Sequence, residues 1–381
     1  MGVGNHMAGI YIHVPYCKSR CVYCDFFTQT DLSTKLNYVS AVCKEIELRK
    51  DYIGNEVVHT IYFGGGTPSL LAMSDLDKIL NTLHKNFKIT ENAEITLEAN
   101  PDDISEEYLV NLKSCFFTRL SLGVQSFDEK ELLFLQRRHS ARQAIDMIHR
   151  AQDIGFDNIS IDLMYGLPNQ TMDLWMENLE TAISLDVQHI SAYHLIYEEK
   201  TKLFRLLEKG MVTEVDEDLS LSMFSSMIDQ LECAGFDHYE ISNFAKDTKY
   251  SRHNTSYWFG KKYLGLGPAA HSFDGEDRAF NVSSITKYID GIDKNGPKIE
   301  IEILSEASRY NDFILTGMRT KWGVDLGVLE EKFGSQYLDY CLSNVKRYID
   351  AKKVIREDNK IKLSKDGIFI SDSIMSDLMW V

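Results

Sequence analysis

Three cysteines within eight residues are the part of the sequence best suited to chemistry: Cys17, Cys21 and Cys24, which directly follow the hydrophobic run 10–14. Iron–sulfur clusters are held by cysteine thiolates, usually four of them. Three at this spacing, with no fourth nearby, predict a four-iron cluster with one iron open to a small molecule. A structural zinc site is the alternative. Zinc normally closes with four ligands, often as two C-x2-C pairs, and this sequence has no second pair.

The remaining cysteines are scattered along the chain, at Cys43, Cys115, Cys233 and Cys341. An odd total of seven, without a secretory signal, fits a reducing compartment and not a disulfide framework. We interpret these four as ordinary small core residues.

Composition narrows the class of protein. The chain has 381 residues, 44% of them hydrophobic, and a net charge of −16. A sizeable core is therefore expected. The acidic balance argues against nonspecific binding to nucleic acid or to an anionic membrane. Without a signal peptide or a membrane-spanning apolar run, we expect a soluble cytoplasmic protein, for which docking on a membrane protein stays open. Residues 1–6 are interpreted as an added leader before a start at Met7.

Short apolar runs alternate with amphipathic stretches over residues 8–200, the predicted core domain. Strands are predicted at 9–14, 60–63, 94–98, 119–124, 159–164 and 190–195. Helices are predicted between them at 33–50, 74–86, 105–114, 140–154 and 171–185. This alternation indicates βαβ units and a parallel sheet. The predicted fold is α/β, a partial TIM-like (β/α)6 barrel, and a doubly wound open sheet is the alternative.

Polar or glycine residues end all six predicted strands. They are the cysteine loop, Gly64-Gly65-Gly66, Glu98, Gln125, Asp162, and Tyr193 with His194. Each alone has an ordinary explanation, such as a tight turn, a helix cap or a buried polar group with a local partner. In a barrel, however, functional residues gather where strands pass into loops. Six such signals together predict one site at that end of the barrel.

Two further regions follow. Residues 201–304 are predicted as an extension of the barrel, with helices near 216–235 and 284–294 and the segment His253-Asn254-Thr255-Ser256-Tyr257-Trp258. Residues 305–381 combine helices near 306–319 and 335–352 with a hairpin around Asp358-Asn359, a winged-helix-like α+β pattern. Because this region is not notably basic, we interpret it as a packing or partner-docking module.

Five stretches resemble the HemN-like branch of the radical S-adenosylmethionine (SAM) superfamily, from about residue 8 to the C-terminal module. They are 11–24, 64–69, Glu98-Ala99-Asn100-Pro101, 122–126 and 161–168. The resemblance implies a [4Fe-4S] cluster on Cys17, Cys21 and Cys24. It also implies that the amino and carboxylate groups of SAM chelate the free iron.

The same resemblance implies a set of SAM-contacting positions. They are Tyr11, Tyr23, Gly65, Gly66, Thr67, Glu98, Gln125, Arg137 and Asp162. The residue types suit the cofactor, because carboxylates are natural partners of its sulfonium and ammonium groups. Arg137 is expected to meet the SAM carboxylate bidentately. Whether one or two SAM molecules are held stays open.

Two families of this branch are candidates: oxygen-independent coproporphyrinogen III dehydrogenases, which catalyse a radical SAM oxidative decarboxylation, and haem chaperones. The dehydrogenases carry a further cysteine two positions after the third ligand, where this chain has Phe26. They also have a long N-terminal extension, whereas the first strand here begins within ten residues. Residues His253 to Trp258 match the HNxxYW motif of the chaperones. The resemblance therefore favours a haem chaperone without dehydrogenase activity, and the dehydrogenase is the alternative.

A haem chaperone implies haem as ligand, haem-requiring respiratory or membrane proteins as recipients, and a haem donor. His253, Tyr257 and Trp258 are the expected haem contacts, since imidazole is a common axial ligand and aromatic rings offer flat apolar surface. His271 is a second candidate ligand. The alternative for the motif is a surface loop anchored by an aromatic pair. The resemblance leaves open whether the protein is a monomer or a cluster-dependent dimer, and whether it docks peripherally at a membrane.

Overall fold

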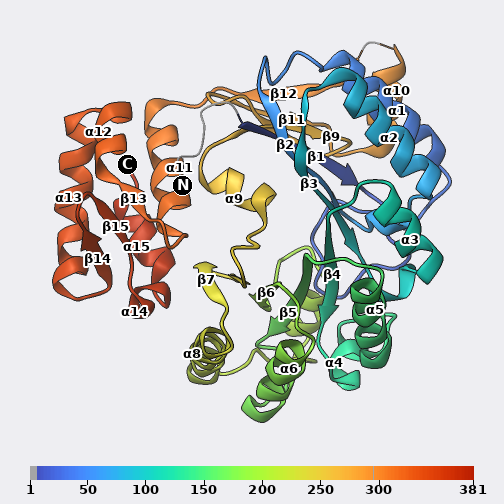
Figure 1. The fold of residues 1–381 in the computed structure, drawn as a ribbon. Helices are drawn as coiled ribbons and strands as arrows, with labels where there is room; N and C mark the ends of the chain where they lie inside the picture. The colour runs from blue at the N-terminus through green and yellow to red at the C-terminus, as the bar shows by residue number, and fades with distance from the viewer. Residues whose placement is uncertain (1–6, 295) are drawn as a thin grey trace.

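A twelve-stranded sheet forms the body of the computed structural model, which describes residues 7–294 and 296–381. The interpreted leader, residues 1–6, lies outside the described residues. Six parallel strands occupy the middle of the sheet in sequence order (Figure 1). They are β1 (Met7–Val14), β2 (Val57–Gly65), β3 (Ile89–Ala99), β4 (Arg119–Gln125), β5 (Ile159–Tyr165) and β6 (His189–His194). Sequential order confirms the partial barrel, because a doubly wound sheet reverses its strand order at a switch point.

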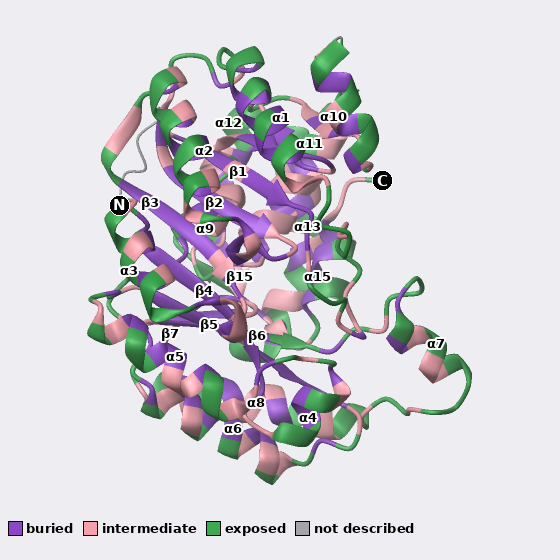
Figure 2. Ribbon diagram, turned by 90° about the vertical axis from the view of Figure 1, so that its right-hand side faces the viewer, coloured by how far each residue is buried: buried purple, intermediate pink, exposed green. Residues whose placement is uncertain are grey.

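Helices cover the outside of these strands, with buried inner and exposed outer faces (Figure 2). They are α1 (Lys35–Leu48), α2 (Met73–Asn86), α3 (Glu106–Ser114), α5 (Ala141–Asp153) and α6 (Met172–Ser184), all close to their predicted ranges. In α2 the buried residues Leu76, Ile79, Leu80 and Leu83 recur at helical spacing. The shorter α4 (Glu129–Phe134) and the 3-10 turns η1 (Pro68–Leu70) and η2 (Pro101–Asp103) were not predicted, because one or two turns leave no periodic signal.

Six further strands extend the sheet at its two ends. Beside β1 lie β9 (Lys262–Leu266), β10 (His271–Phe273), β11 (Arg278–Asn281) and β12 (Ile299–Glu302). Helix α10 (Ile285–Lys294) lies between β11 and β12 in the chain and packs against α1. Beside β6 lie β8 (Asn243–Ala245) and β7 (Asp237–Glu240), both antiparallel to their neighbours. Within the described ranges the sheet ends at β12 and β7, so the barrel stays open. The short strands of these two extensions, three to five residues each, were not predicted individually.

A buried carboxylate fastens the β9–β12 extension to α1. Glu45 is fully buried and accepts hydrogen bonds from the backbone N–H of Gly267 (2.9 Å), from Asn281 (2.7 Å) and from the Tyr288 hydroxyl (2.6 Å). Arg49, one helical turn later, pairs with it at 3.1 Å. The carboxylate thus replaces its lost hydration with protein donors, as a buried charge requires.

The C-terminal region has its own core and a three-stranded sheet, in the helix-plus-hairpin pattern that was predicted. Its elements are α11 (Glu306–Met318), β13 (Val324–Asp325), α12 (Leu326–Phe333), α13 (Ser335–Asp350), β14 (Val354–Glu357), β15 (Lys360–Leu363), α14 (Lys365–Ile368) and α15 (Ser371–Leu378). The domain boundaries at 200/201 and 304/305 stay predictions.

Three further helices lie between β6 and β9 in the chain: α7 (Lys202–Glu208), which projects from the body in Figure 2, α8 (Glu217–Cys233) and α9 (Arg252–Trp258). Helix α9 lies on the inner, concave side of the sheet (Figure 1). Among the described residues, no helix is both long and apolar enough to cross a membrane.

Candidate functional site

A cavity of about 430 Å³ opens where the parallel strands end. All three clustered cysteines and all nine residues expected to contact SAM line it. They are Cys17, Cys21, Cys24, Tyr11, Tyr23, Gly65, Gly66, Thr67, Glu98, Gln125, Arg137 and Asp162. Residues as far apart in the chain as Tyr11 and Asp162 thus meet at one barrel end, as the strand-end argument expects.

The cysteine loop is anchored at its base and at its tip. At the base, Tyr16 and Gln29 form a β-bridge, and Cys17 N donates to the Gln29 carbonyl at 3.0 Å. At the tip, Val22 is 1% exposed and packs with a small apolar cluster that includes Leu203. Leu203 N donates to the Val22 carbonyl at 2.9 Å. The loop therefore presents its thiols at the cavity wall from two fixed points.

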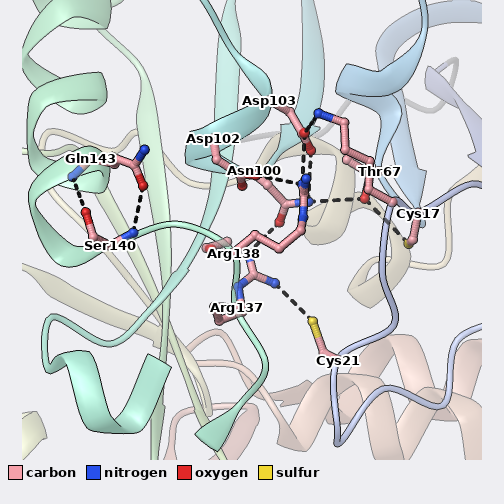
Figure 3. A network of polar contacts seen from close by, with 12 residues as sticks. Cys17, Cys21, Thr67, Asn100, Asp102, Asp103, Arg137, Arg138, Ser140 and Gln143 are labelled. Carbon is pink, nitrogen blue, oxygen red and sulfur yellow. Dashed lines mark hydrogen bonds and ion pairs between the residues drawn. The ribbon is translucent and has the colours of Figure 1, made fainter. Parts of the chain in front are cut away.

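Protein donors point at two of the three sulfurs (Figure 3). Thr67 Oγ1 donates to Cys17 Sγ at 3.5 Å, and Arg137 Nη1 donates to Cys21 Sγ at 3.4 Å. Such donors favour thiolate, which is the form that binds metal. Burial raises the pKa of Cys17, and raises that of Cys24 to about 11. Loading iron on this site therefore has to release protons.

The donor set fits a cluster better than a single ion. In residues 7–294 and 296–381, no three His, Cys, Asp or Glu side chains are grouped so that they could hold one metal ion. A four-iron cluster does not need convergence on a point, because each thiolate binds a different iron. The three half-buried thiols, two with hydrogen-bond donors, match that requirement.

The glycine loop at the end of β2, residues 64–66, packs backbone to backbone against the start of the cysteine loop. Gly66 N donates to the Val14 carbonyl at 2.8 Å. A Cβ on Gly66 would lie 2.6 Å from the Tyr16 carbonyl oxygen, so no side chain fits there. Gly65 has φ +104°, a conformation that favours glycine. These residues shape a backbone wall of the cavity.

Two acidic groups face the same cavity. Glu98 accepts from the Tyr62 hydroxyl at 2.7 Å and from Gly65 N at 3.1 Å. Loss of water around it raises the pKa of Glu98 to about 7, and the same effect raises that of Asp162 to about 6. Such a pair suits a cationic ligand, whose binding would favour the ionised forms.

Arg137 joins the cysteine loop to the carboxyl ends of β3 and β4. Its bond to Cys21 is drawn in Figure 3. Its Nη2 donates to the Gly123 carbonyl at 2.5 Å and to Asn100 Oδ1, and its Nη1 donates to Cys21. Its buried Nε has no hydrogen-bond partner among the described residues. A bidentate carboxylate at Arg137 would therefore have to displace some of these bonds. Gln125 nearby has φ +71°, an uncommon conformation for a side chain-bearing residue.

The HNxxYW segment forms helix α9 and not the surface loop considered as its alternative. His253 is 1% exposed, and both ring nitrogens are engaged, Nδ1 with Thr60 Oγ1 at 2.8 Å and Nε2 with the Tyr257 hydroxyl at 2.7 Å. Trp258 lies elsewhere, with the Arg319 guanidinium 5.3 Å from its ring centre. The structure therefore brings His253 and Tyr257 together but sets Trp258 apart from them.

The second candidate haem ligand, His271, is also distant in sequence and surroundings. It is exposed on β10, and its ring lies edge-on to Phe280 at 4.6 Å. It does not line the cavity that holds the cysteines.

A second, smaller cavity of about 180 Å³ lies deeper in the barrel. Six of its eleven lining residues were singled out from the sequence, and Asn254 belongs to the HNxxYW segment. The lining residues that sequence reasoning missed are Tyr62, Arg119, Ser121 and Ser191. Two signals were available: Tyr62 lies two positions before Gly64 and so shares its face of β2, and Arg119 is a lone charge at the start of an apolar strand.

Comparison with known proteins identifies the family to which the chain belongs. Residues 11–182 match the Radical SAM superfamily, and residues 304–370 match the HemN C-terminal domain. "Heme chaperone HemW" of Bacillus subtilis is 34% identical over 97% of this chain and 98% of its own length. The protein of the same name from Lactococcus lactis is 30% identical over 97% and 96%. The chain belongs to the HemW family.

A solved structure supports the fold. Coproporphyrinogen III oxidase (HemN) from Escherichia coli, a radical SAM enzyme, aligns with a TM-score of 0.85 over 98% of this chain and 90% of its own, at 21% identity. At that identity the likeness concerns the fold alone. Membership of the HemW family confirms the resemblance stated from the sequence, and the radical SAM superfamily implies a [4Fe-4S] cluster and SAM.

Proposed function

We propose that this protein binds haem and passes it to haem-requiring proteins, and that its barrel carries a [4Fe-4S] cluster and SAM. The observation that carries the proposal is the near-full-length similarity to two proteins named as heme chaperones. The residue two places after Cys24 supports it, since Phe26 stands where the dehydrogenases have a cysteine. Phe26 is 63% exposed and lines the mouth of the cavity.

In the proposed cofactor site, Cys17, Cys21 and Cys24 hold the cluster, which supplies one-electron chemistry when bound. Gly65, Gly66 and Thr67 face the cofactor with backbone and hydroxyl groups. Glu98 and Asp162 balance its positive charge, and Tyr11 and Tyr23 cover it. Gln125 and Arg137 complete the wall. All of these residues line one cavity, which supports the assignment.

The haem contacts are a separate part of the proposal. His253, Tyr257 and Trp258 are proposed on the motif match. An iron bond to His253 requires its Nε2 to give up the Tyr257 hydroxyl, because both ring nitrogens are already hydrogen-bonded. His271 needs no such change to accept iron.

We place the protein in the cytoplasm, with haem-requiring respiratory enzymes as recipients and a separate haem donor. Peripheral association with a membrane would then be mediated by those partners, since the acidic chain does not favour anionic lipid. A monomer and a cluster-dependent dimer are both compatible with this proposal.

The decisive experiment is a haemin titration of the protein after anaerobic reconstitution with iron and sulfide. We expect a saturable shift of the Soret band near one haem per chain, and transfer of that haem to an apo-cytochrome. A matched titration of bovine serum albumin controls for unspecific adsorption. If the Soret band shifts without saturation, or only as free haemin does, haem binding is refuted.

Oxidative decarboxylation of coproporphyrinogen III is the second candidate, because the fold matches HemN and the cofactor residues surround one cavity. It predicts protoporphyrinogen under anaerobic reducing conditions with SAM. Cleavage of SAM without loss of the porphyrinogen would exclude this activity while leaving haem binding intact.

A further inference from the structure

Helix α9 forms part of the floor beneath the proposed cofactor cavity, although it lies far along the chain from the cysteine loop. His253, Asn254 and Tyr257 line the smaller, deeper cavity. The two cavities adjoin, since Tyr11, Glu98, Ser121, Asp162 and Tyr193 line both. A side chain of α9 can therefore act on the upper cavity through the residues that separate the two.

His253 is held from three sides. Its backbone N–H donates to Glu94 Oε1 at 3.1 Å, and its ring nitrogens bond Thr60 and Tyr257. Strand β1 packs against it so closely that a Cβ on Gly9 would lie 3.1 Å from the imidazole. Burial, with a further contribution from Arg119, lowers its pKa to about 3. The ring is thus neutral, with one nitrogen donating and the other accepting.

The imidazole stacks on Tyr62, with ring centres 5.1 Å apart and an interplanar angle of 24°. The ring centre of Tyr11 lies 6.1 Å from that of Tyr62 and 6.3 Å from that of His253. The three near-parallel rings therefore form one cluster, in which Tyr11 lines both cavities and the other two rings line the smaller one. The stack leaves Tyr62 little freedom, because its ring is 7% exposed.

Tyr62, held in place by the stacked rings, contacts the carboxylate of Glu98 in the upper cavity. Its hydroxyl donates to Glu98 Oε1 at 2.7 Å, while Gly65 N of the glycine loop donates to Oε2 at 3.1 Å. Each carboxylate oxygen thus has one donor. The direction in which Glu98 presents its charge depends on both, and one of the two is set by the stacked ring.

We infer that His253 is a positioning residue for the cofactor cavity: by its hydrogen bonds and its stack on Tyr62 it orients the carboxylate of Glu98. The inference rests on the proposed role of Glu98 in holding the cationic cofactor. It assigns the buried imidazole of α9 to the cofactor cavity and not to the haem iron. Tyr257 contributes by fixing the imidazole at Nε2.

Equilibrium dialysis of SAM against the cluster-loaded protein tests the inference. We compare wild type with His253→Ala, His253→Phe, Tyr62→Phe and the double variant of His253→Ala with Tyr62→Phe. Hydrogen bonds to charged groups are among the stronger ones, so Tyr62→Phe should weaken SAM binding about tenfold. His253→Ala should approach that loss, and His253→Phe, which keeps a stacking ring, should lose less.

The double variant supplies a readout that general destabilisation does not give. If His253 acts through Tyr62, adding His253→Ala to Tyr62→Phe should cost little more than Tyr62→Phe alone. Thr255→Val, on the same helix but outside both cavities, is the matched control and should bind SAM as wild type does. Thermal unfolding and iron content check that each variant folds and loads.

Two outcomes would overturn the inference: unchanged SAM affinity in Tyr62→Phe, or additive losses in the double variant. The Tyr62→Phe result stands even where His253→Ala does not fold. A parallel haemin titration separates this inference from the proposed function. Saturable haem binding by His253→Phe excludes His253 as the essential axial ligand. If wild type does not bind haem, the chaperone role is refuted, but the effect of the variants on SAM affinity still tests the role of His253.

Discussion

Glu98 shows how a single residue is tuned by its surroundings. The strand places it on the cavity wall, loss of water raises its pKa to about 7, and the Tyr62 hydroxyl and Gly65 N–H counter part of that rise. With such a pKa, the neutral and ionised forms of the carboxyl are both populated near pH 7. Binding of a cationic ligand would favour the ionised form.

Replacement of Glu98 by Gln should flatten the pH dependence of both stability and SAM binding. From about pH 4.5, the usual value, up to about 7, the folded protein keeps a proton that the unfolded chain has released, so stability falls as pH rises. SAM binding to wild type should instead strengthen over the upper part of this range, as the carboxylate forms. Thermal unfolding of the SAM-free variant and dialysis from pH 5.5 to 8 measure both. Asp162, whose pKa is raised to about 6, should leave Glu98→Gln with a weaker pH dependence, whereas a dependence as steep as that of wild type would contradict this account.

Arg137 offers a second test at the same scale, since its guanidinium joins Cys21, Asn100 and Gly123. Arg137→Lys keeps the charge but loses the planar fork. We expect a loss of about 1–3 kcal/mol in stability and weaker retention of iron after gel filtration. Arg138→Lys is the matched control, because Arg138 pairs with Asp102 and Asp103 at a more exposed site. Equal effects in the two variants would count against a special role of Arg137.

Among the elements, the extension β9–β12 is held in position by specific side-chain hydrogen bonds, and its sequence shows little strand periodicity. Its short strands continue the barrel sheet at β1, yet the sequence there is rich in glycine. The buried Glu45 of α1 collects three donors from this extension. A helix residue thereby specifies where a segment more than 200 residues later is placed.

Glu45→Ala should therefore destabilise the protein by about 3–5 kcal/mol, because it leaves Arg49 buried without its carboxylate partner. Glu47→Ala, on the exposed face of the same helix, should change stability by less than about 0.5 kcal/mol. Urea unfolding followed by circular dichroism measures the difference. A similar midpoint for both variants would show that the extension is held by other contacts.

For the molecule as a whole, the barrel and the C-terminal region meet through backbone hydrogen bonds, ion pairs and aromatic contacts, and Arg319 lies among them. Arg319 Nη2 pairs with the buried Glu240 at 2.8 Å, and Ile241 N donates to the Arg319 carbonyl at 3.2 Å. Trp258 lies beneath the same guanidinium, so this junction also touches α9. The Arg319–Glu240 contact therefore lies next to helix α9, which lines the smaller cavity beneath the proposed cofactor site.

Arg319→Met should weaken this junction by about 1–3 kcal/mol, since Glu240 loses its charged donor. Hydrogen exchange should rise first in α9, α11 and β7, and not in β1–β6. The exposed Arg356 on β14 provides the control variant Arg356→Met, for which exchange should stay at the wild-type level. Uniform acceleration across the barrel would mean that the two regions unfold as one unit.

Much of the barrel was predictable, because its signals are local. Alternating apolar strands and amphipathic helices located all six parallel strands, and the cysteine spacing with five motifs led to the superfamily and to the HemW branch. The nine expected cofactor residues were chosen by motif, and the structure places them around one cavity. Sequence reasoning missed residues without a motif, such as Tyr62, although its place on the same face of β2 as Gly64 was a usable signal. The very short strands, such as β10, carry no periodic signal.

The candidate cluster ligands were indicated by the sequence itself, since three thiols within eight residues can converge wherever the chain forms a compact loop, whereas an extended strand would hold the outer two more than about 20 Å apart. Tertiary structure decided the surroundings. It buried His253 under Tyr62, gave each oxygen of Glu98 a donor, and brought Arg137 to Cys21. These contacts join segments 30 to nearly 200 residues apart, and their geometry follows from how the whole sheet curves and packs, which no local pattern encodes.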